Sequence, residues 1–377
     1  MRIALFYHSI LSDWNHGNAH FLRGIASELM ARNHDVVVYE PRDAWSVANL
    51  VREYGPESLE ALYSTYPRFR VIRYDSATLD LSMALRDVDL VLVHEWNDPE
   101  LVMRIGAHRK CHDHDCLLFH DTHHRAASEI HKIAQFDLHS YDGVLAYGAS
   151  LRDIYLKSGL AENVWVWHEA ADTRVFHPKF ENRRGQPPDF FDGDVVWVGN
   201  WGDDERVAEI NEFFIEPVVQ LGLKARVYGV RYPASAIAAL HNAGIEYAGW
   251  LPNFRVPDVF SRFRATVHIP RRPYVEQLPG IPTIRPFEAL ACGIPLICAP
   301  WNDVEGLFRP GRDYLMANNA PEMIAHLRRV LGDPEFAAEL SSNGLQTIAR
   351  SHTCAHRVDE LLRLYSRTHV AAFGVSQ

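Results

Sequence analysis

The segment "GIPTIRPFEALACGIPLICAP" (280–300) places groups that bind charged ligands at the start of a short helix. We predict Glu288 in the first turn of that helix, after Arg285 and Pro286, with Gly293 ending the helix before the buried strand "IPLICA". A carboxylate in a first turn can simply complement the helix dipole. The alternative is that the carboxylate and the arginine hold a ligand together.

The neighbours of this helix favour a ligand. Gly280 and Thr283 belong to a tight loop whose backbone amides can point at an anion from the helix N-terminus. Arg285 adds a charge suited to phosphate, and Arg271 and Arg272 follow the predicted strand "ATVHIP" at the same edge. A carboxylate among such charges is well placed to accept hydrogen bonds from ribose hydroxyls.

A second candidate is the strand-to-helix junction "VVWVGNWGDDERVAEI" (195–210). The strand ends at Gly199, which lets the backbone approach a ligand closely, and the following helix contains Arg206. The plain alternative is an ordinary turn with a solvent-exposed arginine. The glycine spacing matches neither a Walker phosphate loop nor a dinucleotide fingerprint.

Histidines concentrate between residues 108 and 139. The stretches "CHDHDC" and "HDTHH" contain ligands that zinc accepts. However, Cys-x4-Cys with interposed Asp and His is not a standard zinc pattern, and no second pair of ligands follows it. A solvated polar loop at 111–115 is the competing interpretation, and we predict no metal site.

Strand-like and helix-like segments alternate along the chain, which predicts two α/β units in tandem. The strands are unbroken apolar runs, as expected of parallel sheets covered on both faces. The polar, proline-bearing segment 177–194 is the best linker. We predict an N-terminal domain at 1–175, to which a last helix at 355–377 crosses back, and a second domain at 190–354. Two such sheets facing each other would form a cleft at the carboxyl ends of their strands. The predicted strands are "RIALFYH", "DVVVYE", "VDLVLVHE", "CLLFHD", "GVLAYG" and "VWVWHE" in the first half, then "VVWVGN", "ARVYGV", "IEYAGW", "ATVHIP" and "PLICAP".

The amino-acid composition limits the classes of protein to which this chain can belong. The chain has 377 residues, of which 47% are apolar and 23% charged, as in a globular protein. A net charge of −10 argues against a general nucleic-acid binder. No run is long enough for a membrane span, and the start "MRIALFYHSI" is predicted to be a strand and not a signal peptide. An odd number of cysteines, five, indicates free thiols in a reducing cytoplasm.

Several motifs resemble the group-1 (family 4) glycosyltransferases of the GT-B fold, and in particular their spore-maturation-protein-like branch. "HGNAHFLRGIASELMARNHDVVVYE" is similar to that family's opening, and "HEAADTRVFHP" (168–178) to the segment that ends its first domain. "FEALACGIPLI" (287–297) is similar to its "EAMACGxPVV" element, and 320–365 follows its C-terminal helical pattern. The resemblance therefore covers nearly the whole chain and implies an α/β fold of two doubly wound Rossmann-like domains.

The resemblance also implies roles for individual residues. Glu288 would hold the donor ribose, Gly199 and Arg206 would flank the diphosphate, and the backbone of Thr283 and Ile284 would meet the distal phosphate and the sugar. The other predicted donor-binding residues are Asn200, Gly229, Arg272 and Arg285 on the second domain, and Gly17 and Asn18 on the first.

"LLFHDTHHRA" (117–126) is similar to a family element whose histidine contacts the donor sugar. Matching the threonine places that histidine at His123, with His120 and His124 as neighbouring candidates. Asp121 would orient a histidine or act as a base toward the acceptor. A near-neutral pKa suits a histidine to bonding the sugar or to sharing the acceptor proton. We predict His123, His120 and Asp121 as catalytic residues.

The chain departs from the family pattern at two positions. A second glutamate, eight residues before Glu288, usually contacts the transferred sugar, and Gly280 stands there. The arginine that usually follows the loop glycine is Asn200. Glu276 is a candidate replacement for the missing carboxylate, although its spacing differs.

The resulting prediction is a cytoplasmic glycosyltransferase, with or without peripheral membrane contact, that uses a UDP- or GDP-sugar. It would transfer the sugar with retention to a small molecule, a glycan or a lipid-linked glycan, without a required cofactor and without nucleic acid. A nucleotide-sugar 2-epimerase and an inactive sugar- or nucleotide-binding module of the same fold remain as alternatives.

Overall fold

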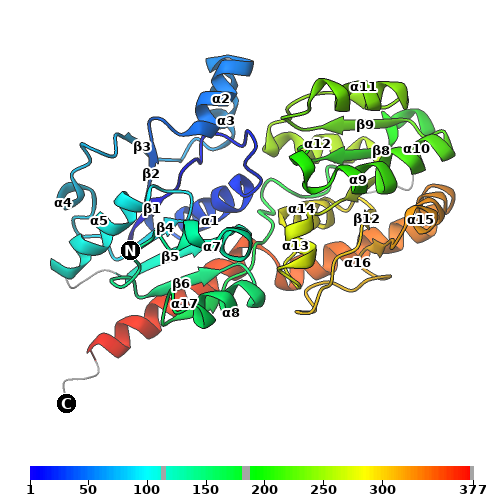
Figure 1. Ribbon diagram of the computed structural model, residues 1–377. Helices are drawn as coiled ribbons and strands as arrows, with labels where there is room; N and C mark the ends of the chain where they lie inside the picture. Colours follow the sequence, from blue (N-terminus) through cyan, green and yellow to red (C-terminus); the bar gives the residue numbers. More distant parts are fainter. Residues whose placement is uncertain (112–115, 181–186, 374–377) are drawn as a thin grey trace. The chain divides into compact units, whose positions relative to one another are not determined.

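The computed structural model describes residues 1–111, 116–180 and 187–373, and these residues form two compact units (Figure 1). Unit 1 comprises Met1–Glu169 and Cys354–Gln377, and unit 2 comprises Ala170–Thr353. The first boundary between the units therefore precedes the 177–194 segment that we predicted as the linker.

Unit 1 is built on a seven-stranded parallel sheet in the order β3-β2-β1-β4-β5-β6-β7. This is the doubly wound Rossmann order with one added edge strand. The middle strands β1, β4 and β5 are buried along almost their whole length, which explains their unbroken apolar sequences. The strands are β1 (Arg2–Phe6), β2 (Asp35–Pro41), β3 (Val71–Tyr74), β4 (Leu90–His94), β5 (Cys116–Asp121), β6 (Gly143–Ala146) and β7 (Val164–Val166).

The helices of unit 1 include the last helix of the chain, α17 (Cys354–Phe373), which lies beside α1 (Ala19–Ala31) (Figure 1). Arg32, just after α1, joins the two helices through an ion pair to Asp359 of 2.5 Å. Trp167 donates a hydrogen bond from its indole to the Arg357 carbonyl at 2.9 Å. The other helices are α2 (Trp45–Tyr54), η1 (Pro56–Leu59), α3 (Glu60–Thr65), α4 (Leu81–Ala84), α5 (Pro99–Cys111), α6 (Arg125–Ser128), α7 (Ile130–Ile133) and α8 (Ala149–Lys157).

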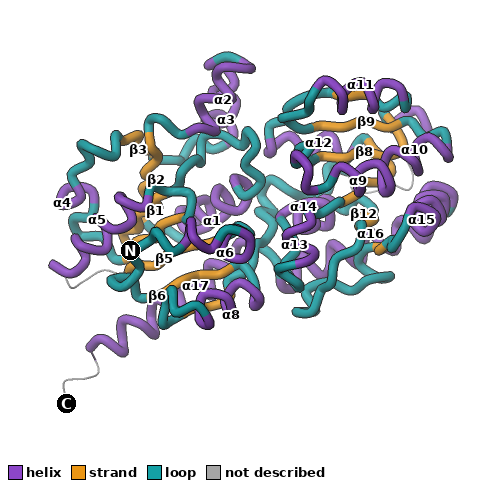
Figure 2. Tube along the Cα trace, in the orientation of Figure 1, coloured by secondary structure: helices purple, strands orange, loops and turns teal. Residues whose placement is uncertain are grey.

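Unit 2 has a six-stranded parallel sheet in the order β10-β9-β8-β11-β12-β13. Its core gathers aromatic side chains such as Trp197 and Phe214 with aliphatic ones such as Val267 and Leu327. Parallel strands place their carboxyl ends at one edge of the sheet, so the loops that directly follow the strands begin at that edge (Figure 2). The strands are β8 (Gly193–Val198), β9 (Ala225–Tyr228), β10 (Glu246–Tyr247), β11 (Phe263–His268), β12 (Leu296–Cys298) and β13 (Leu315–Met316).

The helices of unit 2 include one irregular helical run over residues 207–221. It passes from α9 (Val207–Ile210) through a π-helical turn, η4 (Asn211–Ile215), into α10 (Glu216–Leu221). Pro217 lies at the start of α10 and has no backbone N–H to donate, so the wider turn falls where α-helical bonding is interrupted. The other helices are η2 (Pro188–Phe190), η3 (Asp203–Glu205), α11 (Ala234–Asn242), η5 (Asn253–Arg255), α12 (Val256–Ser261), α13 (Arg272–Glu276), α14 (Ile284–Cys292), α15 (Ala320–Gly332) and α16 (Pro334–Ser351).

The predicted fold of two parallel α/β units is confirmed, but two strands were missed. β3 and β13 are both edge strands, and they are short. β3 has the sequence VIRY and is only partly buried, so it lacks the apolar run that identifies a central strand. Within the described residues, no helix is long and apolar enough to cross a membrane.

Candidate functional site

The N-terminus of α14 in unit 2 faces polar groups from a neighbouring strand. Thr283 is the N-cap residue, and its side chain does not cap the helix. Its Oγ1 instead lies 3.1 Å from Nε2 of His268, at the end of β11. Burial, with Arg206 and Arg285 nearby, lowers the pKa of His268 to about 3, so this imidazole is neutral at pH 7. In the first turn, Ile284 and Arg285 have backbone N–H groups that can donate hydrogen bonds to an anion, whereas Pro286 has none.

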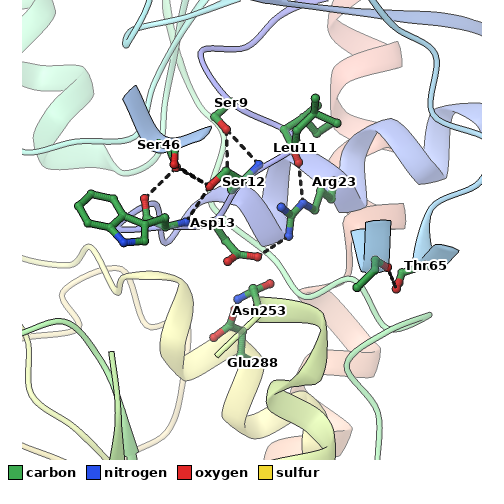
Figure 3. Close-up of polar contacts among 12 residues, drawn as sticks. Ser9, Leu11, Ser12, Asp13, Arg23, Ser46, Thr65, Asn253 and Glu288 are labelled. Atoms are coloured by element: carbon green, nitrogen blue, oxygen red, sulfur yellow. Dashed lines mark hydrogen bonds and ion pairs between the residues drawn. The ribbon is translucent and has the colours of Figure 1, made fainter. Parts of the chain in front are cut away.

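Glu288 lies in the second turn of α14, which corrects our placement of it in the first. The helix begins at Ile284, two residues before Pro286, so its first turn holds no acidic residue. The Glu288 side chain is fully buried and accepts a hydrogen bond from Asn253 Nδ2 at 2.7 Å (Figure 3). It also forms an ion pair with Arg285. Complementing the helix dipole is therefore not its role, since that effect acts at the first turn.

Arg206 is buried beneath the loop that follows β8. Its guanidinium donates to the backbone carbonyls of Ile269 at 2.8 Å, Trp201 at 3.4 Å and Asn200. Burial, with Arg271 nearby, lowers the pKa of Arg206 to about 9, so it still carries its charge at pH 7. The predicted solvent-exposed alternative for this arginine is wrong, because its residue is only 9% exposed.

The loop glycines Gly199 and Gly229 pack against each other's backbone. A Cβ on Gly229 would lie 2.2 Å from the Gly199 carbonyl oxygen, and a Cβ on Gly199 would lie 2.8 Å from the Trp197 indole nitrogen. Neither position has room for a side chain. Asn200 accepts a hydrogen bond from the Val230 amide at 3.0 Å through its side chain. The requirement for glycine here thus has a packing reason in addition to any contact with a ligand.

Positive charge converges at this edge of unit 2. Arg206 is close enough to Arg271 and Arg285 for both to lower its pKa. Acidic side chains hold the outer arginines: Arg271 pairs with Glu205 at 3.1 Å, and Arg272 with Glu209 at 3.5 Å. The structure therefore brings most of the predicted donor-binding residues of the second domain into one cluster of cations, amides and a buried carboxylate.

In unit 1, the predicted catalytic residues lie at the end of β5, which holds His120 and Asp121, and in the turn after it, which holds His123. The Asp121 carboxylate is buried and accepts hydrogen bonds from the His123 amide at 2.9 Å and the Tyr155 hydroxyl at 2.7 Å. Burial raises the pKa of Asp121 to about 6, and these two hydrogen bonds oppose the rise. Asp121 thus fixes the turn that carries His123, whose ring packs edge-on against Trp96 with 5.1 Å between centroids.

The loop after β1 is tied to the same turn. Asn18, the N-cap residue of α1, donates through its side-chain amide to the carbonyl and the hydroxyl of Thr122. The Thr122 hydroxyl also lies 3.1 Å from His94 Nε2. Gly17, the residue before Asn18, is exposed. Two loops from distant parts of the chain therefore hold one another immediately before His123.

Two buried charged side chains hold the loop over residues 8–18. Neither of them was predicted from the sequence as a site residue. Glu40 accepts hydrogen bonds from the amides of Ile10 at 2.6 Å and Leu11 at 3.0 Å. Arg23 donates to the Ile10 carbonyl at 2.8 Å and pairs with Asp13 at 2.8 Å, beside the hydrogen bonds among the serine side chains drawn in Figure 3. These polar contacts therefore hold the loop in place, although it contains few apolar residues.

A second ion pair lies next to His123. The Glu95 carboxylate, fully buried just after β4, pairs with Arg125. The Arg125 guanidinium stacks over the Trp96 ring at 3.9 Å, and Trp96 in turn contacts His123. Burial raises the pKa of Glu95, and Arg125 opposes that rise. Glu95 and Arg125 are thirty residues apart, so nothing local in the sequence indicated the pair.

His120 lies in the core of unit 1. It is fully buried in β5, its ring packs against Trp167 at 4.8 Å and Phe21 at 5.9 Å, and neither ring nitrogen has a hydrogen-bond partner among the described residues. Burial lowers the pKa of His120 to about 3. These surroundings favour a packing role over the predicted catalytic one.

This burial gives a pH-dependent prediction. A histidine with a pKa near 3 when folded and about 6.5 when unfolded binds more protons in the unfolded state, so it lowers the free energy of unfolding by about 2 kcal/mol between pH 7 and pH 5. The variant His120→Phe should lack this loss. Urea unfolding of both proteins at the two pH values measures it, and parallel pH dependence would contradict the assignment.

Metal binding finds no support in the part of the chain that the structure describes, where no group of three or more histidine, cysteine or acidic side chains is arranged to hold an ion. Residues 112–115 of the "CHDHDC" stretch lie outside the described residues. The cysteines whose side chains are described are buried: Cys116, Cys292, Cys298 and Cys354.

Family models match both halves of the chain. Residues 17–175 match the model described as Glycosyltransferase Family 4, and residues 206–363 match the one described as Glycosyl transferase-like. This chain belongs to the glycosyltransferases. Neither description identifies the spore-maturation-protein-like branch, which stays a prediction. A search of curated proteins finds no match to this glycosyltransferase.

Solved structures share the fold of this glycosyltransferase over nearly its whole length. Sucrose-phosphate synthase from Thermosynechococcus elongatus is 15% identical, with a TM-score of 0.65 over 98% of this chain and 100% of that one. HepE from Anabaena, in complex with UDP-glucose, is 13% identical, with a TM-score of 0.68 over 97% and 100%. A glycosyltransferase from Rickettsia africae is 10% identical, with a TM-score of 0.64 over 97% and 98%. The predicted GT-B fold is confirmed.

Proposed function

We propose that this glycosyltransferase moves a sugar, with retention, from a nucleotide diphosphate sugar to an acceptor. Unit 2 binds the donor: Glu288 accepts hydrogen bonds from the ribose, and Arg206, Arg271 and Arg285 neutralise the diphosphate. UDP is the first nucleotide to test, because HepE is described in complex with UDP-glucose. GDP is the second, because the sequence predicts a UDP- or a GDP-sugar as the donor.

One observation carries this proposal: a buried carboxylate, three arginines and a helix N-terminus meet at the carboxyl edge of the unit 2 sheet. The cations and amides suit a diphosphate, and the carboxylate suits neutral hydroxyl groups. In glycosyl transfer the diphosphate leaves with increasing negative charge. Preorganised cations and amide dipoles that stabilise this charge therefore lower the barrier.

The side chains of unit 1 contribute a separate set of groups. Asp121 orients the turn that carries His123, and the Asn18–Thr122 contact fixes the loop after β1 against it. We assign His123 to hydrogen bonding or proton transfer at the reacting groups, roles that imidazole side chains commonly take in enzymes. Asp121 is assigned a positioning role, because its two described partners are the His123 amide and the Tyr155 hydroxyl.

Donor binding can be measured directly. At about 100 times its Kd, UDP or GDP should raise the free energy of unfolding by about 2.7 kcal/mol and the Tm by several degrees. AMP serves as the control, because it lacks the diphosphate. Turnover of UDP-glucose or GDP-mannose should follow for the nucleotide that binds, and should persist in excess EDTA. The absence of any shift with both diphosphates would overturn the proposal.

A further inference from the structure

The backbone at Gly280 excludes a side chain. Its φ of +89° lies in the region that favours glycine, and a Cβ there would lie 2.7 Å from Val304 Cγ2. The Gly280 amide already donates a hydrogen bond to the Asn302 carbonyl at 2.7 Å. Position 280 therefore cannot supply a carboxylate in this fold, and the loop over residues 302–305 is what occupies the space.

That loop presents a different carboxylate at the same place. Glu305 Oε1 lies 3.3 Å, and its Cγ 3.1 Å, from the point where a Cβ on residue 280 would be. The loop is fixed by Asp303, which accepts hydrogen bonds from the amides of Leu307 at 3.1 Å and Phe308 at 2.8 Å. The Glu305 carboxylate is thus carried by an ordered turn. Glu276, the alternative suggested by the sequence, is exposed at the end of α13.

The charges near Glu305 limit the class of ligand that its carboxylate can bind. Gly280 is three residues before Thr283, the N-cap of α14, where the amides and Arg285 suit an anion. A carboxylate beside such a site repels phosphate and so contributes nothing to holding it. It does accept hydrogen bonds from hydroxyl groups, and a hydrogen bond to a charged acceptor is among the stronger ones in proteins.

We propose that Glu305 binds hydroxyl groups of the transferred sugar and so determines which donor sugar the enzyme accepts. This rests on the proposed function, because it places the sugar beyond a diphosphate held at the N-terminus of α14. The ligand class is a neutral hexose with free hydroxyl groups. The carboxylate comes from the loop after β12, and Gly280 provides the space for it.

The test compares binding of the nucleotide with binding of the sugar nucleotide. In Glu305→Gln and Glu305→Ala, the Kd of UDP, measured by calorimetry, should stay within about twofold of the wild type. The kcat/KM for UDP-glucose, or for GDP-mannose if GDP is the nucleotide bound, should fall about 10- to 100-fold. Glu305→Asp, which keeps the charge, should recover part of that loss. Glu339→Gln, an exposed residue of α16, is the matched control.

The outcomes separate this proposal from the one on which it rests. If wild-type protein binds neither UDP nor GDP, the proposed function fails and the role of Glu305 fails with it. If wild-type protein binds and turns over the donor while both Glu305 variants match Glu339→Gln, only the role of Glu305 is overturned. A variant that loses UDP affinity and kcat/KM equally also overturns it, because the defect then lies in nucleotide binding. Unchanged Tm values show that the variants fold.

Discussion

Alanine at position 288 is expected to weaken the binding of a nucleotide diphosphate by about 1.5–3 kcal/mol and to lower the free energy of unfolding of unit 2 by about 3–5 kcal/mol. The first loss is the hydrogen bond from ribose to a charged acceptor. The second arises because Glu288 is fully buried and paired with Arg285, so its removal leaves a largely buried cation without its carboxylate. Calorimetry and urea unfolding measure the two effects separately.

The variant Glu288→Gln separates the contribution of the Glu288 charge from that of its hydrogen bond with Asn253. The glutamine carbonyl can still accept the hydrogen bond from Asn253, while the charge opposite Arg285 is lost. A double variant, Glu288→Gln with Arg285→Gln, removes both charges and should recover part of the stability without restoring nucleotide affinity. Glu339→Ala, on an exposed part of α16, is the control. A folded Glu288→Ala protein with wild-type affinity would exclude Glu288 from the donor site.

The sequence predicted local features of the fold well. β5 occupies Cys116–Asp121, the same residues as the predicted strand "CLLFHD", because a buried parallel strand is an unbroken apolar run between turn formers. The start of α14 was misplaced, because Pro286 suits any position of a first turn and does not fix which residue begins the helix. The edge strand β3 lacked the apolar pattern.

The partners within the site could not be predicted, because the fold brings them together from distant positions. Asn253 is 35 residues from Glu288, and His268 is 15 residues from Thr283. The acceptors of Arg206 are backbone carbonyls, which any sequence provides, so the sequence could not show that this arginine is buried. Glu305 could not be predicted as a neighbour of Gly280, because only the φ of the glycine and the course of the 302–305 loop reveal that the two residues are close.

His123→Ala is expected to lower kcat for sugar transfer about 100-fold or more while leaving the Kd of UDP within about twofold. The reason is geometric. Asp121 bonds the His123 amide, Trp96 packs against the ring, and Glu95 and Arg125 hold Trp96, so a network that spans β4 and β5 keeps one imidazole in place.

The matched control is His139→Ala, because the His139 side chain is 92% exposed. Asp121→Asn keeps an oxygen for the His123 amide and should cost less than His123→Ala, because it preserves the imidazole itself. If His123→Ala instead weakened UDP binding as much as it slowed turnover, the residue would belong to the nucleotide site. If neither changed, the network around it would be structural, and the chemistry would have to come from other side chains.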